Sequence, residues 1–424
     1  MKKILSFIIC IVVIANLAAC SNSLGSVASK SPVYPKGISF EDYDSFRTVR
    51  VENPIDDSYL KAMNDFSYSV ASKILSGQTK NISYSPTGLY MTLSLAATGA
   101  KGVTQAEILS VLGLSGKGIE FLSKQNSNLY RLLYTDNKVG KLKIANSLWL
   151  KKDRDFKEIF IDNAVQNFYA SIHNIDFSDD NAAKLMSKWI SENTKGILIP
   201  EISLDKEQIM SIMNTIYFKD EWADRFYKDN TKPDTFYLVD GSEIECDFMN
   251  STHLTNGFVD GDGFTSSSLS LKNSGNMVFI LPDKDVSVNN LLATPQMVAL
   301  LFNTKSSESG KVIFQIPKFS FGNDLDLNES IKSLGVKSAF KSDADFTGIT
   351  DDIAFISSIK QQTHVAIDEN GVEAAAFTQV NLNGSAPPKD KKAEMILDRP
   401  FIFAITSNSG VILFVGVVND PTDI

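Results

Sequence analysis

The chain is poor in the side chains that usually perform hydrolysis, because His173, His253 and His364 are its only histidines. None of them lies in a His-Glu-x-x-His zinc motif, and the chain has neither a Gly-x-Ser-x-Gly nucleophile elbow nor a Cys-x-x-Cys pair. His364 alternates with Val365 in a strand-like stretch, so we expect it to be structural. The sequence therefore predicts a protein that is not an enzyme and that uses no metal or cofactor.

Two other patterns resemble ligand-binding loops but fail at a required position. The run Asp324-x-Asp326-x-Asn328 begins like a calcium loop, but Glu329 stands where that loop needs glycine. The glycine-rich run 113–118 does not have the spacing of a phosphate-binding loop. We expect the first pattern to cap a helix and the second to form a loop after a helix.

Residues 371–384 have the alternation of a strand but the flanking residues of a loop. Small or apolar residues alternate with larger or polar ones, which is the period of a strand with one buried face. Gly371 and Gly384 bracket the segment and Pro387 and Pro388 follow it, which favours an exposed loop. The sequence therefore predicts a loop that can become a strand. The predicted core-facing residues are Val372, Ala374, Ala376, Thr378, Val380 and Leu382; Glu373, Phe377, Gln379, Asn381 and Asn383 face outward.

The first nineteen residues predict a secretion signal, with Lys2 and Lys3 before an apolar run over residues 4–14. That run is shorter than the roughly 20 residues that a transmembrane helix needs. Leu17-Ala-Ala-Cys20 is similar to a bacterial lipobox, which predicts that Cys20 carries a lipid anchor. The alternative is an ordinary signal peptide that is cleaved near Ala19.

The net charge restricts which partners the chain can bind, and the cysteine content restricts how its fold can be stabilised. Removal of residues 1–19 would change the formal charge from −9 to −11, and such an acidic chain is not expected to bind nucleic acid. Cys246 would then be the only free cysteine, so no intrachain disulfide is expected. With 43% apolar residues, the chain can instead bury a large core.

Residues 20–45 are rich in Ser, Gly and Pro and predict a flexible tether, whereas residues 46–424 predict one large domain. Helices are expected near 58–75, 157–170 and 181–193, and another begins at Pro86 with Ser85 as its cap. The expected strands are 81–85, 143–150, 210–218, 277–281, 312–316 and 411–417. Because strict alternation of strands and helices is missing, the predicted class is α+β.

Several short motifs occur in order between about residue 58 and residue 421. They are Asn81-Ile82-x-x-Ser85-Pro86, Asn146-Ser-Leu-Trp149, Trp189 to Gly196, Asn214-Thr-Ile-Tyr-Phe218-Lys219-x-x-Trp222, Pro317-Lys318-Phe319, Leu334-Gly335, Asp398-Arg399-Pro400-Phe401 and Phe414 to Pro421. Together they resemble the serpin family of serine protease inhibitors, here as a bacterial lipoprotein member. The resemblance implies three β-sheets, eight or nine helices and an exposed reactive-centre loop at about 369–395.

The resemblance also implies a mechanism and the residues that perform it. A protease cleaves the loop and forms an acyl-enzyme, and the loop then inserts into the main sheet and distorts the protease. The implied hinge residues are Glu369, Gly371, Val372, Glu373, Ala374, Ala375 and Ala376. The implied residues of the sheet opening and shutter are Ser83, Ser85, Asn214, Lys219, Trp222 and Gln361, with Gln361 where animal members usually have histidine.

The cleaved bond is predicted at one of two places. Counting forward from the hinge places it between Ser385 and Ala386, which favours elastase-like or broad-specificity serine proteases. Counting back from Arg399-Pro400-Phe401 places it at Lys389 and Asp390, which favours trypsin-like ones. We favour the first, because the hinge fixes the length that inserts.

The sequence thus favours a monomeric inhibitor of serine endopeptidases, with cysteine endopeptidases as a secondary candidate class, anchored through Cys20 to a membrane of the bacterial envelope. The alternative is a non-inhibitory family member that acts as a binding or scaffold protein and whose loop is only a substrate.

Overall fold

The computed structural model describes residues 29–273, 275–373 and 391–423. This part of the chain contains ten α-helices, against the eight or nine expected. One of them, α1, precedes the first predicted helix, and α8 is a single turn closed by a capping box. The helices are α1 (Tyr43–Glu52), α2 (Asp57–Ile74), α3 (Pro86–Gly99), α4 (Gly102–Val111), α5 (Ile119–Leu133), α6 (Glu158–Asn167), α7 (Asp180–Asn193), α8 (Val288–Leu291), α9 (Pro295–Leu301) and α10 (Asn328–Leu334).

The strands form two hydrogen-bonded sheets. The seven-stranded sheet has the order β11-β12-β13-β5-β3-β2, with β4 also paired to β3. Its strands are β11 (Phe319–Asp326), β12 (Lys360–Ile367), β13 (Gly371–Val372), β5 (Met210–Glu221), β3 (Lys141–Lys151), β2 (Thr135–Asp136) and β4 (Ala170–Ile175). The nine-stranded sheet consists of β1 (Ile82–Tyr84), β16 (Ile412–Val418), β15 (Phe401–Thr406), β9 (Gly275–Pro282), β8 (Phe264–Leu271), β7 (Glu243–Gly261), β10 (Glu308–Pro317), β14 (Lys392–Ile396) and β6 (Lys232–Tyr237).

The α+β class is confirmed. The three expected sheets appear as two hydrogen-bonded sheets, because β7 pairs with strands of two of them. Its first residues pair with β6, its middle pairs with β10 and its last residues pair with β8. A single strand of 19 residues therefore joins two groups of strands that would otherwise be separate sheets.

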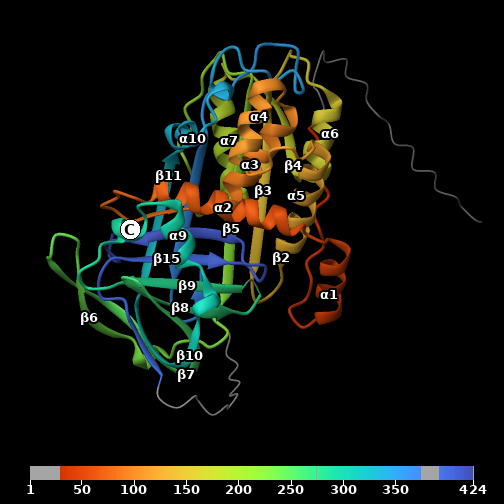
Figure 1. The fold of residues 1–424 in the computed structure, drawn as a ribbon. Helices are drawn as coiled ribbons and strands as arrows, with labels where there is room; N and C mark the ends of the chain where they lie inside the picture. Colours follow the sequence, from red (N-terminus) through yellow and green to blue (C-terminus); the bar gives the residue numbers. More distant parts are fainter. Residues whose placement is uncertain (1–28, 274, 374–390, 424) are drawn as a thin grey trace, which may run out of the picture.

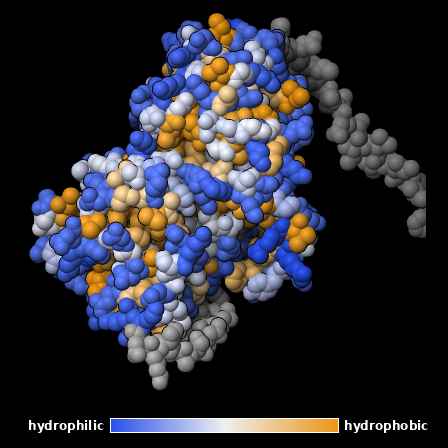
Figure 2. All heavy atoms as spheres, viewed as in Figure 1, coloured by the Kyte–Doolittle hydropathy of each residue, from blue (hydrophilic) through white to orange (hydrophobic). Residues whose placement is uncertain are grey.

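Figure 1 shows how these elements are arranged. The helices α3 to α7 gather around β3, β4 and β5 at one end, and β8, β9 and β15 lie at the other end. Hydrophobic residues on the visible face lie singly or in small groups among hydrophilic ones (Figure 2). Across the described ranges, no helix combines the length and the apolar character needed to cross a bilayer.

Helix α3 connects the two sheets, since it contacts both β5 and β16. Most of its side chains are buried, as expected for a helix that is apolar on all sides. The predicted start is confirmed: Pro86 opens the helix, and the Ser85 hydroxyl accepts a hydrogen bond of 3.1 Å from the Gly88 amide. Helix α3 is thus a fixed support under the centre of the main sheet.

Residues 30–38, which the sequence places in a tether, contact the body of the protein. The Ile172 amide of β4 donates a hydrogen bond of 2.7 Å to the carbonyl oxygen of Lys30. The ring of Tyr34 stacks on those of Tyr134 and Tyr169, at 6.5 Å between centroids in each case. Any free tether therefore has to end before Lys30.

Replacement of Tyr34 by alanine tests the stabilising role of this contact. We expect the variant to lose about 1 kcal/mol of stability, since two stacked aromatic pairs disappear. The melting temperature of the intact protein measures the effect. Tyr43→Ala is the control, because the side chain of Tyr43 on α1 is 72% exposed. An equal shift in both variants would contradict a specific role for Tyr34.

Candidate functional site at the sheet opening

The predicted hinge begins as a short strand inside the main sheet. β13 lies between β12 and β5, where Val372 pairs with Ile367 on one side and with Asp220 on the other. Val372 is 2% exposed and belongs to the hydrophobic core. The prediction that Val372 faces inward is therefore confirmed, and the first two residues of the segment already occupy a strand position.

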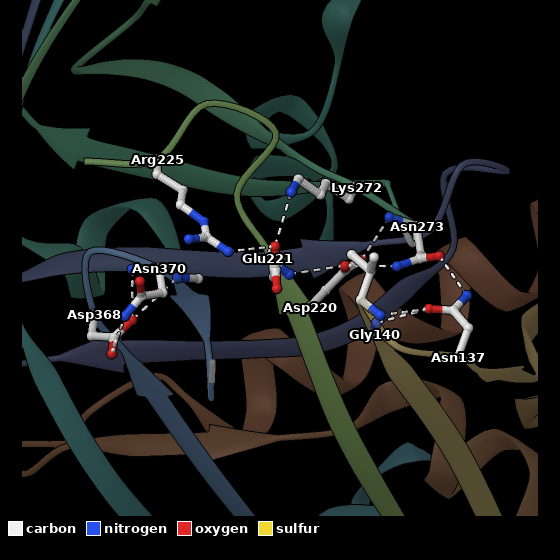
Figure 3. Close-up of polar contacts among 11 residues, drawn as sticks. Asn137, Gly140, Asp220, Glu221, Arg225, Lys272, Asn273, Asp368 and Asn370 are labelled. Carbon is white, nitrogen blue, oxygen red and sulfur yellow. Dashed lines mark hydrogen bonds and ion pairs between the residues drawn. The ribbon is translucent and has the colours of Figure 1, made fainter. Parts of the chain in front are cut away.

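A tight turn joins β12 to β13 (Figure 3). The Asp368 carboxylate accepts hydrogen bonds from the amides of Asn370, at 2.7 Å, and Gly371, at 3.2 Å. Trp222 is fully buried beside this turn and holds it in place, because its indole Nε1 donates to the Asp368 carbonyl oxygen at 2.8 Å. A Cβ on Gly371 would lie 2.2 Å from the main-chain oxygen of Asp220, so only glycine fits here.

Two adjacent acidic residues at the end of β5 anchor the opening (Figure 3). The Asp220 carboxylate accepts bonds from the Asn273 amide at 2.9 Å and from its side chain at 3.0 Å. The Glu221 carboxylate binds Arg225 at 2.7 Å and Lys272 at 2.8 Å. Burial alone would raise the pKa of Glu221, but the hydrogen bonds and charges of these two cations outweigh it and lower that pKa.

Glu369, on the other side of the turn, is also held by specific partners. Its carboxylate accepts a bond of 2.9 Å from the Thr231 hydroxyl and lies 3.3 Å from Lys318 Nζ. Burial opposes ionisation, but these bonds and its own amide together lower the pKa of Glu369. The base of the segment is therefore fixed by charged contacts to two other parts of the chain.

Glu373 is the last described residue before a gap in the described chain, and its conformation is unusual. Its φ of +53° is in the left-handed region, although its amide still donates to the Ala366 carbonyl of β12 at 3.0 Å. One carboxylate oxygen lies 3.3 Å from His364 Nδ1 on β12. On β5, burial, together with the charge and hydrogen bond of Glu373, raises the pKa of Tyr217 to about 12.

The predicted shutter residues come together where α3 meets the main sheet. The Gln361 side chain accepts a bond of 2.6 Å from the Ser85 amide and donates one of 3.0 Å to the Ser85 carbonyl. The Ser83 carbonyl accepts a bond of 2.9 Å from the Thr363 hydroxyl, and its amide donates to Asn323 at 2.6 Å. Gln361 therefore connects β12 to the start of α3 through both ends of its amide.

Asn214 approaches the same place from β5. Its side-chain nitrogen donates to Asn146 at 2.8 Å, whereas its side-chain oxygen is buried and has no partner among the described residues. A Cβ on Gly88 of α3 would lie 2.2 Å from that oxygen and 3.2 Å from the Gln361 nitrogen. The two amides thus approach each other over Gly88 from the two strands that flank β13.

Between β5 and β12 the main sheet is open below β13. No main-chain pair between these strands is found in the described residues beyond those that β13 makes with each. A narrow groove lies there, with a cavity volume of about 40 Å³. Its lining includes Leu89 and Leu93 of α3, Ile212 and Asn214 of β5, and Ile359 and Gln361 at the β12 side.

The remaining predicted residues have different outcomes. Lys219 lies half-buried on β5, and its main chain pairs with Lys141. Ala374, Ala375, Ala376, Ser385, Ala386, Lys389, Asp390 and Cys20 lie outside the described residues.

The sequence did not indicate Asp220, a specific role for Tyr217 within its motif, or the contact of His364 with Glu373. The alternation along the strands could have predicted the contact of His364 with Glu373, because both side chains fall on the outward face of the sheet.

Comparison with known proteins agrees with this geometry. The family model described as serpin (serine protease inhibitor) matches residues 61–421. Serpin-Z7 of Hordeum vulgare is 28% identical over 363 residues, which cover 80% of this chain and 90% of that protein.

Two solved structures of the thermophilic serpin Tengpin are similar to the described structure. Its native state has a TM-score of 0.78 at 27% identity and covers 93% of this chain and 100% of that one. Its latent state has a TM-score of 0.74 at 28% identity, with coverage of 86% and 98%. On the family model and on these relatives, the chain belongs to the serpin family.

Proposed function

We propose that this serpin is a suicide inhibitor of serine endopeptidases, with cysteine endopeptidases as a secondary candidate class. The observation that carries the proposal is β13: the start of the loop already lies as a strand between β5 and β12, above an open groove. A strand that continues downward from Val372 would meet edges of β5 and β12 that have no main-chain partner there among the described residues. The remainder of the loop is therefore suited to complete the sheet.

The register of β13 specifies where each following residue would lie. Continued pairing brings Ala374 between Phe218 and Val365, and then Ala376 between Ile216 and Thr363. Thr378 would lie between Asn214 and Gln361, so a hydroxyl would enter beside the two shutter amides.

The same register ends at Leu382, opposite Met210, where β5 begins. Residues 372–382 would thus fill the length of β5 as about 36 Å of strand. Small side chains on the core face suit a strand that enters between two existing neighbours.

Insertion follows from the chemistry of cleavage. The nucleophilic oxygen or sulfur of the protease attacks the carbonyl carbon of the cleaved bond, the amide bond breaks, and the new amine leaves on the C-terminal fragment. The N-terminal fragment remains bound to the protease as an ester or thioester. Because that fragment is now free at one end, it can enter the groove and carry the protease with it.

The free energy released by strand insertion is large enough to drive the proposed change. Each ladder hydrogen bond contributes about 0.5–1.5 kcal/mol net, so ten residues supply about 10 kcal/mol. This is comparable with the total stability of an ordinary domain. The intact form is then metastable and persists because conversion is slow.

The proposed target and location rest on the sequence. Ser385–Ala386 is the proposed bond, with elastase-like or broad-specificity proteases as targets, and Lys389–Asp390 with trypsin-like ones is the alternative. Residues 1–19 are proposed as a signal, with lipidated Cys20 anchoring a monomer to a membrane of the bacterial envelope.

Adjacent alanines provide a matched test of inhibition. Ala374→Arg would place a charge on the core face, and we expect it to turn the inhibitor into a substrate. Ala375→Arg carries the same charge on the outward face and should still inhibit. After mixing with an elastase, a denaturing gel shows a covalent complex only for an inhibitor. Cleavage of the parent chain without a complex would instead support a non-inhibitory binding protein.

Cleavage within the loop should raise the melting temperature well above that of the intact chain, because the inserted strand adds ladder bonds to both of its neighbours. Thermal unfolding before and after limited proteolysis measures this, and mass spectrometry of the fragments identifies the cleaved bond. Equal melting temperatures for the two forms would rule out insertion.

A further inference from the structure

Glu373 stops the strand one residue after Val372. Its amide still follows the β12 ladder through Ala366, but its left-handed backbone turns the chain out of the strand direction. Further insertion therefore requires Glu373 to adopt an extended conformation. Any contact that holds its present conformation delays that change.

The Glu373 carboxylate makes such contacts with both flanking strands. It lies 3.3 Å from His364 Nδ1 on β12, and on β5 it lies close enough to Tyr217 to raise the pKa of that hydroxyl. The Glu373 side chain is 13% exposed, so water screens these contacts only partly. The carboxylate thus connects two strands that do not pair directly at this level.

The carboxylate also blocks the path of the loop. In the register of β13, the residue that would lie between His364 and Tyr217 on the outward face is Ala375. The Glu373 side chain now contacts both of those residues. It has to leave before Ala375 can enter.

The same register provides Glu373 with a new partner. Once extended, Glu373 would lie directly opposite Lys219 on the same face of β5. Lys219 is half-buried, and no carboxylate within the described ranges lies within ion-pair distance of it. Insertion would therefore exchange the contacts with His364 and Tyr217 for an ion pair with Lys219.

We propose that Glu373 is a positioning residue with two alternative sets of partners: His364 and Tyr217 hold the loop out of the sheet, and Lys219 receives Glu373 when the loop inserts. This inference rests on the proposed function, because it assigns residues to the insertion step. It makes the start of insertion a discrete exchange of contacts.

Melting temperatures of the intact and loop-cleaved forms test the exchange. Tyr217→Phe removes one hydroxyl and should lower the melting temperature of the intact form only. Lys219→Met removes the charge but keeps a side chain of similar length, and it should lower the melting temperature of the cleaved form only. The control is Gln362→Ala, whose side chain lies on the same strand as His364 but bonds to Asp324; it should affect both forms alike.

Coupling between substitutions gives a second readout that a general structural role would not produce. In a Glu373→Gln background, Lys219→Met should no longer affect the cleaved form, because the ion pair is already lost. Tyr217→Phe should also speed spontaneous conversion of the intact chain to the high-melting form by about tenfold, because the Glu373 carboxylate loses one polar neighbour.

The outcomes separate this inference from the proposed function. If cleavage leaves the melting temperature of the parent chain unchanged, insertion itself fails and the proposed function fails with it. If cleavage raises that temperature but Tyr217→Phe and Lys219→Met shift both forms equally, insertion stands and the role of Glu373 is wrong. Additive effects of Lys219→Met and Glu373→Gln in the cleaved form would equally overturn it.

Discussion

The structure depends on an unfilled place in its main sheet. Strands need partners along both edges, because buried main-chain amides and carbonyls are destabilising when they lack hydrogen bonds. In the described residues, β5 and β12 are joined only through Gly371 and Val372, and below them a groove runs down to α3. The most favourable partner for these edges is a strand that continues from Val372. The fold therefore contains both the vacancy and the start of the segment that would fill it.

The contacts around this place hold it open at two levels. At the top, Trp222 and Asp368 fix the turn before β13, while Glu221 and Glu369 are held by cations from other parts of the chain. At the centre, Gln361 binds both main-chain groups of Ser85, which connects β12 to the buried start of α3. These bonds fix each strand to its own surroundings and leave the gap between them free. Entry of a strand then leaves these contacts in place and has to displace those of Glu373 with His364 and Tyr217.

The sequence predicted the parts of this arrangement that depend on local pattern. Apolar periodicity located α2, the pair Ser85-Pro86 located the start of α3, and the alternation of the loop placed Val372 on the core face. The pattern did not reveal β7, because its 19 residues are mostly polar and change partners along their length. It also did not reveal the left-handed conformation of Glu373, which a glutamate seldom adopts. Contacts such as Ser83 with Thr363 join residues 280 positions apart and exist only once the sheets have formed.

Amide hydrogen exchange, measured before and after cleavage of the loop, follows insertion one residue at a time. We expect residues 374–382 to be strongly protected from exchange after cleavage and less protected before it. The amides of β5 and β12 that face the groove should gain protection in the same step, since they acquire partners. Rapid exchange of residues 374–382 in both forms, with no change at β5 and β12, would contradict the account.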